Sequence, residues 1–220
     1  MGDAVIAVLV VDDDPLVRTG LRAILGAERD IEVVGDAQDG SEVLDRVREW
    51  HPDVVLMDVR MPTLDGIAAT RQLLTALSDP PKVVVITTFE NDSYVYDALR
   101  VGAAGFLLKR ARPDEIVQAV RTVATGDSVL FPTAIRSLVA ARAGDFTNSG
   151  LSQANLTDRE AEVLRAMANG LTNAEIAASM FLGVETIKTH VRNVLMKLGA
   201  RDRTQAVITA YESGFIAPGR

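Results

Sequence analysis

Four short, strongly apolar runs in the first half of the chain each end in polar side chains, and this pattern restricts the fold most. The runs are residues 8–11, 54–57, 83–86 and 106–108. The polar residues that follow them are Asp12, Asp13, Asp58, Thr87 and Lys109. Short aliphatic runs of this kind are typical of buried parallel strands. Because sites in open parallel sheets form outside the carboxyl ends of the strands, we expect these polar side chains to meet in one pocket.

Strand and helix patterns alternate through the first 125 residues. The expected strands are residues 4–11, 31–36, 53–58, 82–87 and 105–109. The expected helices are residues 15–27, 40–50, 65–77, 92–101 and 113–125. Five such units predict an α/β domain, with a five-stranded, doubly wound parallel sheet that has helices on both faces.

The strand signal disappears after about residue 131. A short helix is expected from Pro132 to Arg142, followed by a flexible linker from Ala143 to Asn155. Helix patterns resume at residues 157–169, 173–180, 185–198 and 204–213. The chain therefore divides into three expected segments: a first domain at 1–126, a connecting helix and linker at 127–152, and a small all-α domain at 153–220.

Composition and charge limit where the protein works and what it binds. The chain has no cysteine, which excludes disulfides and thiolate metal sites. It has no apolar stretch near the roughly 20 residues that span a membrane, and no signal-peptide pattern, so we expect a cytoplasmic protein without membrane insertion. Residues 1–130 carry a net charge of −9, whereas residues 131–220 carry +2, which suggests two domains with different partners.

The residue types of the expected pocket suit phosphoryl transfer. Adjacent Asp12 and Asp13 offer the oxygen ligands that Mg²⁺ prefers. Asp58 could accept a phosphoryl group as an acyl phosphate, while Lys109 and Thr87 would supply a positive charge and a hydroxyl. The alternative is a set of polar residues that only cap strands at a solvent edge. The recurrence at successive strand ends favours the functional interpretation.

Four segments of the first half carry a resemblance to a known family, namely Val10-Val11-Asp12-Asp13-Asp14-Pro15, Pro52–Pro62, Ile86-Thr87-Thr88 and Gly102–Lys109. They resemble the receiver domains of two-component response regulators, which have a flavodoxin-like fold. The resemblance implies that Asp58 is the phosphoacceptor. It also implies a Mg²⁺ site formed by Asp12, Asp13, Asp58 and the backbone carbonyl of Arg60. Thr87 would be the switch hydroxyl, Phe106 the rotating aromatic and Lys109 the pocket lysine, although Phe106 could equally be a simple core residue. Arg110 departs from the family, in which proline is frequent at this place.

Two helices near residues 173–198, joined by a turn containing Gly183, form a possible helix-turn-helix. In the second helix one apolar stripe is expected to be buried, comprising Ile187, Val191, Val194, Leu195 and Leu198. The opposite surface would place Lys188, Thr189 and Arg192 against base edges in the major groove. Thr186 and Lys197 could contact phosphates. Periodicity alone leaves open an ordinary small helical bundle with a solvated polar face.

The segments Leu156–Glu160, Ile187–Val191 and Lys197–Arg203 resemble the LuxR-type DNA-binding domain. Together the two halves resemble the NarL/FixJ class of response regulators. In that class the last helix helps to pair two DNA-binding domains. The resemblance therefore implies a dimerisation surface within Thr204–Tyr211, formed by Ala206, Val207, Ala210 and Tyr211.

The whole pattern predicts a transcription regulator controlled by phosphorylation, and not an enzyme. A sensor histidine kinase would phosphorylate Asp58 with Mg²⁺ present, and the phosphorylated protein would form a homodimer on double-stranded promoter DNA. One alternative is a phosphatase that works through an aspartyl phosphate, but Val59-Arg60 supplies no obvious acid–base carboxylate. Another is a constitutive DNA-binding protein, which the intact acidic set disfavours.

Overall fold

The computed structural model of the chain describes residues 5–88, 93–125 and 155–216. The chain forms two compact units, and the division between them falls between Val129 and Leu130. The expected helix from Pro132 to Arg142 lies outside the described residues, as does the expected linker up to residue 154. The expected domain boundaries at residues 126 and 152 therefore stay predictions.

The first unit is the expected doubly wound α/β fold. Its strands are β1 (Ile6–Val11), β2 (Ile31–Ala37), β3 (Val54–Asp58), β4 (Lys82–Thr87) and β5 (Gly105–Leu108). Its helices are α1 (Pro15–Gly26), α2 (Gly40–Trp50), α3 (Gly66–Ala76), α4 (Ser93–Val101) and α5 (Pro113–Ala124). All neighbouring strands pair in parallel, in the order β2-β1-β3-β4-β5. The flavodoxin-like prediction is confirmed.

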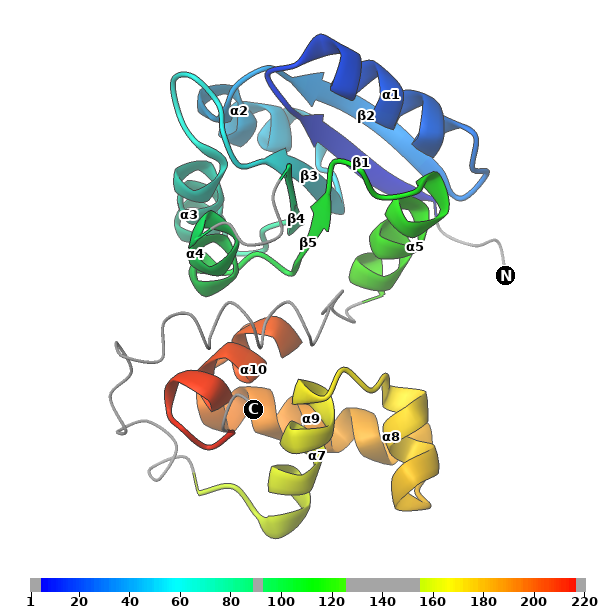
Figure 1. Cartoon of the computed structure of the whole chain (residues 1–220), viewed down its shortest axis with the longest axis vertical. Helices are drawn as coiled ribbons and strands as arrows, with labels where there is room; N and C mark the ends of the chain where they lie inside the picture. The colour runs from blue at the N-terminus through cyan, green and yellow to red at the C-terminus, as the bar shows by residue number, and fades with distance from the viewer. Residues whose placement is uncertain (1–4, 89–92, 126–154, 217–220) are drawn as a thin grey trace. The chain divides into compact units, whose positions relative to one another are not determined.

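Helices cover both faces of this sheet, with α1 and α5 on one face and α2, α3 and α4 on the other (Figure 1). Every residue of β3 is buried, as expected for a central strand covered on both sides. Alternate strand residues, including Val8, Val10 and Leu56, pack with Leu25 of α1 and Val120 of α5. This two-sided burial explains why the strands are continuous apolar runs, so the first polar residue of each run marks the sheet edge.

Aspartates start three of the helices that follow the strands. Asp14 caps α1 by accepting a hydrogen bond from the Leu16 amide at 2.8 Å, and Pro15 is the first helical residue. Asp39 caps α2, and Asp65 caps α3 through the Ala68 amide at 2.8 Å. Each carboxylate satisfies amides that have no partner inside the helix. Because each of these helices follows a strand in the chain, its N-terminus lies at the sheet edge where that strand ends.

The second unit is a small all-α domain, as predicted. It contains α7 (Asp158–Ala168), α8 (Asn173–Met180), α9 (Val184–Leu198) and α10 (Arg203–Glu212). Reciprocal capping boxes start α7 and α8, formed by Thr157 with Glu160 and by Thr172 with Glu175. Its core contains apolar side chains from all four helices, including Val163, Leu164, Met167, Ile176, Ile187, Val194 and Ala206. Across the described part of the chain, every helix is too short or too polar to span a membrane.

Candidate functional site

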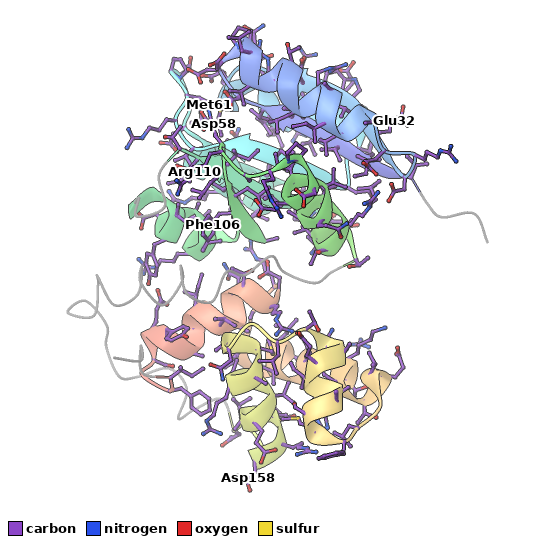
Figure 2. The ribbon with its side chains drawn as sticks, turned by 45° about the vertical axis from the view of Figure 1, so that its right-hand side comes forward. Glu32, Asp58, Met61, Phe106, Arg110 and Asp158 are labelled. Atoms are coloured by element: carbon purple, nitrogen blue, oxygen red, sulfur yellow. The ribbon has the colours of Figure 1, made fainter. Side chains whose placement is uncertain are left out.

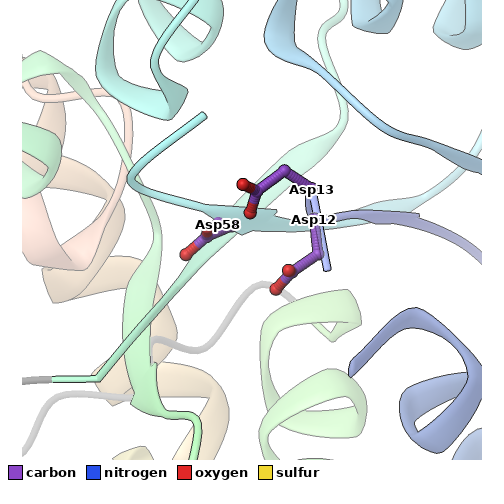
Figure 3. Close-up of side chains that lie close together, drawn as sticks. All are labelled: Asp12, Asp13 and Asp58. Carbon is purple, nitrogen blue, oxygen red and sulfur yellow. The ribbon is translucent and has the colours of Figure 1, made fainter. Parts of the chain in front are cut away.

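Three carboxylates from two adjacent strands meet at one edge of the sheet. Asp12 and Asp13 follow β1, and Asp58 ends β3, which pairs with β1 up to Val11 and Met57. Figure 3 shows the three side chains gathered at this edge, and one carboxylate oxygen from each lies within 4.8 Å of the others. Asp12 is 1% exposed and Asp58 is 5% exposed, whereas Asp13 is open to solvent. The predicted acidic cluster is therefore present.

Lys109 brings the positive charge to this cluster. Its Nζ lies 2.7 Å from Asp12 Oδ2 and 3.2 Å from Asp58 Oδ2. The contact with the buried Asp12 Oδ2 is an ion pair without hydrogen-bond geometry. The Lys109 amide donates to the Thr87 carbonyl at 2.7 Å, which ties the end of β5 to the end of β4. Thus residues at the ends of β1, β3 and β5 meet at one edge of the sheet, and the end of β4 is bonded to that of β5.

The charges of the pocket do not balance. Burial and the neighbouring charge of Asp12 raise the pKa of Asp58 to about 6, although the Lys109 ammonium opposes this rise. Burial alone would lower the pKa of Lys109, but its close contact with the Asp12 carboxylate and the charge of Asp58 raise it instead. One ammonium faces three carboxylates, and the excess is negative. A set of oxygen donors with this charge fits a hard divalent cation such as Mg²⁺.

Thr87 and Phe106 belong to the two strands beside the acidic cluster. Thr87 is the last residue of β4 and is 4% exposed. Phe106 lies in β5, pairs in register with Val85, and is 3% exposed. In Figure 2, Asp58 and Met61 lie at one end of the sheet and Glu32 at the opposite end. Because Asp58 pairs with Ile86, the next residue, Thr87, lies at the edge that carries the cluster. Its switching role and that of Phe106 stay predictions.

The polar face of α9 is exposed as expected. Ile187 and Val194 are buried, and Val191, Leu195 and Leu198 are half-buried. Four of the five residues predicted to contact DNA on this helix are exposed, namely Thr186, Lys188, Thr189 and Arg192. Lys188 pairs with Glu185 at 2.8 Å, and the Thr189 hydroxyl donates to the Glu185 carbonyl at 3.0 Å. Two of the five residues of the predicted stripe are thus fully buried and three only partly, and the base contacts stay predictions.

Lys197, the fifth predicted DNA contact, lies in a different setting. Its Nζ is 2.6 Å from Glu160 Oε2 and also donates to the Asn155 carbonyl at 3.1 Å. Glu160 is 4% exposed, and the Lys197 hydrogen bond is the main cause of its lowered pKa. Helix periodicity could not reveal this partner, which lies 37 residues away. The ion pair gives Lys197 a structural role, and a phosphate contact would have to compete with it.

A Lys197→Met substitution is therefore expected to destabilise the second unit by roughly 2–3 kcal/mol, because it leaves the Glu160 carboxylate buried without its counter-charge. Since the pKa of Glu160 is lowered from an ordinary 4.5, the pair stabilises the fold above about pH 4.5 and loses this contribution in more acidic solution. Urea unfolding at neutral pH and near pH 3 measures both effects.

The matched control for this measurement is Lys188→Met. Lys188 pairs with Glu185, whose side chain is 84% exposed, so its loss should change the unfolding free energy by less than about 1 kcal/mol. If Lys197→Met keeps full stability and instead reduces the salt dependence of DNA binding, Lys197 contacts phosphate and the structural role is wrong.

Arg203 is another basic residue that does not face solvent. It is 6% exposed, and its guanidinium donates to the Leu171 carbonyl and to Asn173 Oδ1. It thereby holds the turn between α7 and α8 against the first residue of α10. The sequence analysis found the motif that contains Arg203 but not this function, because a surface arginine and a buried one look alike in sequence.

The residues predicted for dimerisation are buried in this structure. The exposed fractions of Ala206, Val207, Ala210 and Tyr211 are between 0% and 2%. As they stand, these side chains present no free surface to a second copy. Pairing through them stays a prediction, and it would require that they first become exposed.

Comparisons with known proteins match both units. The family described as "Response regulator receiver domain" matches residues 8–121, and "Bacterial regulatory proteins, luxR family" matches residues 154–210. The transcriptional regulatory protein LiaR of Bacillus subtilis is 42% identical over 211 residues, covering 96% of this chain and 99% of LiaR. The response regulator protein VraR of Staphylococcus aureus is 40% identical over 214 residues, covering 96% and 99%. The solved structure of the response regulator ChrA has a TM-score of 0.54 at 35% identity, covering 97% of this chain and 100% of ChrA.

Proposed function

The chain belongs to the two-component response regulators that carry a receiver domain followed by a LuxR-type DNA-binding domain, and on this premise we propose that phosphorylation of Asp58 controls its binding to promoter DNA. The observation that carries the proposal is the convergence of Asp12, Asp13, Asp58 and Lys109. A buried charge cluster that is not balanced destabilises the fold, and such clusters are typical of reactive sites. This favours a chemical role for Asp58.

Asp58 is the proposed nucleophile. A carboxylate oxygen of Asp58 attacks the phosphorus of a phosphohistidine on a partner kinase, and the bond between phosphorus and the imidazole nitrogen breaks as the acyl phosphate forms. The kinase imidazole leaves with the bonding electron pair. Lys109, which already lies 3.2 Å from Asp58 Oδ2, would pair with the new phosphoryl oxygens. The chain supplies mainly charge and position, which is what phosphoryl transfer requires.

Mg²⁺ is the cofactor that fits this cluster. Asp12, Asp13, Asp58 and the Arg60 carbonyl would hold it, since the carboxylate oxygens already lie within reach of one ion. When bound, the ion would neutralise negative charge on the phosphoryl oxygens. Burial and the charge of Asp12 together raise the pKa of Asp58, and the ion would offset the charge of Asp12 and so favour the ionised nucleophile.

Residues of β4 and β5 would respond to the phosphoryl group. In the phosphorylated state the Thr87 hydroxyl would donate to a phosphoryl oxygen, and Phe106 would repack within the face formed by α4, β5 and α5. Both side chains are nearly fully buried, so a small shift of Thr87 must be accommodated by its neighbours. Phosphorylation then shifts the population between two states of this face, because it interacts more favourably with one of them.

The phosphorylated protein would form a homodimer on double-stranded DNA in the cytoplasm. The exposed face of α9 suits the major groove, with Lys188, Thr189 and Arg192 near base edges. Two linked DNA-binding domains bind two half-sites, so dimerisation raises affinity without new base contacts. We expect slow loss of phosphate from Asp58 and no multiple turnover of small phosphate esters.

Beryllofluoride, which mimics an acyl phosphate, tests this function. Adding it with Mg²⁺ is expected to tighten binding to an operator selected from random DNA by about tenfold or more, and to raise the sedimenting mass toward a dimer. The same additions with a chelator in place of Mg²⁺ serve as control. If beryllofluoride changes neither the DNA affinity nor the mass, the first unit does not control DNA binding in this way.

A further inference from the structure

The loop of residues 59–65 connects Asp58, a member of the acidic cluster, to α3. Its two ends are joined, because the Gly66 amide donates to the Val59 carbonyl at 2.9 Å. Gly66 also packs tightly against the strand end, where an added Cβ would lie 2.1 Å from the Asp58 carbonyl oxygen. The position of this loop therefore decides where the backbone next to Asp58 lies, including the Arg60 carbonyl.

Asp39 holds the middle of this loop from another element. Its carboxylate accepts hydrogen bonds from the Thr63 amide at 2.8 Å and the Leu64 amide at 3.1 Å, which are 24 and 25 residues away in sequence. The same carboxylate accepts from the Ser41 amide at 2.9 Å and the Ser41 hydroxyl at 2.7 Å. The Ser41 bonds account for its role as the cap of α2. The Thr63 and Leu64 bonds exceed what a helix cap needs.

Gly40, the next residue, allows the loop to come this close. A Cβ at this position would lie 2.3 Å from the Leu64 carbonyl oxygen and 3.0 Å from Ala69 Cβ. Any side chain here would push the loop away from the start of α2. Asp39 and Gly40 thus together hold the loop: Asp39 binds its amides, and Gly40 leaves room for the Leu64 carbonyl.

The carboxylate of Asp39 is charged under ordinary conditions. Burial alone would raise its pKa, but the hydrogen bonds from Ser41, Thr63 and Leu64 outweigh burial and lower the pKa to about 2. Bonds from amides to an ionised acceptor are stronger than bonds between neutral groups. Because Asp39 is only 9% exposed, water competes little for these bonds.

We propose that Asp39 is a positioning residue of the phosphorylation site, whose carboxylate sets the loop of residues 59–65 in place before a cation or a phosphoryl group arrives. This inference rests on the proposed function of Asp58. Groups that orient a site without touching the reacting atoms commonly affect metal affinity and rate, because they hold the contacting groups in the productive geometry. Asp39 would act on the backbone at Arg60 through Thr63 and Leu64.

The test uses the full chain with two substitutions. Asp39→Ser keeps a hydroxyl that can cap α2, but one hydroxyl cannot also accept from Thr63 and Leu64. In metal-free protein, the Thr63 and Leu64 amides are expected to exchange hydrogen faster than in the wild type. Mg²⁺ affinity by calorimetry, and the rate of phosphorylation at limiting Mg²⁺, should each fall about tenfold, while high Mg²⁺ restores much of the rate.

The control is Ser41→Ala, which removes one bond to Asp39 and leaves the loop amides bound. It should match the wild type in exchange, Mg²⁺ affinity and rate. If Asp39→Ser unfolds the protein, Asp39→Asn keeps the shape but turns an amide NH₂ toward a donor, and a similar loss is expected. Wild-type behaviour in both Asp39 variants, or an equal loss in Ser41→Ala, would overturn the proposal.

The same experiment separates this proposal from the proposed function. If the wild-type protein gains no phosphate on Asp58, the proposed function is contradicted, and amide exchange and Mg²⁺ affinity still decide the role of Asp39.

Discussion

An Asp58→Asn variant is expected to gain no phosphate when it is incubated with Mg²⁺ and a small phosphodonor, whereas the wild type gains one group per chain. A carboxamide is not a nucleophile toward phosphorus, so the expected loss is complete. The substitution also removes one of the two carboxylates paired with Lys109, at 3.2 Å. Intact mass measurement gives the phosphate count directly. Beryllofluoride should no longer change the DNA affinity of this variant.

The control for this experiment is Asp14→Asn. Asp14 follows the acidic pair but caps α1 through the Leu16 amide, and asparagine caps helices about as well as aspartate. This variant should therefore keep its fold and accept one phosphate. Stoichiometric phosphate on the Asp58→Asn protein would show that another residue is the acceptor, and the proposed function would then need a different site.

The second large effect is expected on DNA binding. Arg192→Ala and Lys188→Ala remove exposed cations from the face of α9 that lies opposite Ile187 and Val194. Loss of a bidentate contact to a guanine should cost about 1–3 kcal/mol of binding free energy and relax specificity at one base pair. Affinities for the matched operator and for operators changed at single positions measure both effects.

Arg192→Lys separates the two ways in which Arg192 could bind DNA. Lysine keeps the positive charge but loses the planar fork that reads a guanine. If Arg192 reads a base, Arg192→Lys should resemble Arg192→Ala in its relaxed specificity. If Arg192 only contacts phosphate, Arg192→Lys should bind nearly as the wild type. In that case Arg192→Ala weakens all sequences alike and reduces the salt dependence, and the proposed base contact is wrong.

The sequence was most informative for the α/β unit. Its expected strands and helices end within two residues of those observed, because strands covered on both faces, such as β3, must be continuous apolar runs. The first polar residue after each run then marks the edge of the sheet. This reasoning brought Asp12, Asp58 and Lys109 together correctly, since the carboxyl ends of parallel strands lie at one edge.

The same reasoning was less informative for the helical unit. The period of α9 identified its buried stripe, but the period says nothing about which distant residue contacts a given side chain. From the sequence we therefore interpreted Lys197 as a surface cation, although it forms an ion pair with Glu160. In α10, Ala206, Val207, Ala210 and Tyr211 are buried together with the polar Arg203 and Thr204. Polar residues inside a buried helix hide the extent of its burial from any hydrophobic pattern.

By itself the sequence determined the family, the order of the elements and the composition of the pocket. Apolar periodicity and side-chain chemistry depend only on the types of the residues and their order. Only the tertiary structure decided what holds the loop beside Asp58. The partners of Asp39 there are the backbone amides of Thr63 and Leu64, and the close approach of Leu64 depends on Gly40. Every residue except proline carries such an amide, so no residue type marks the ones that a distant carboxylate will bind.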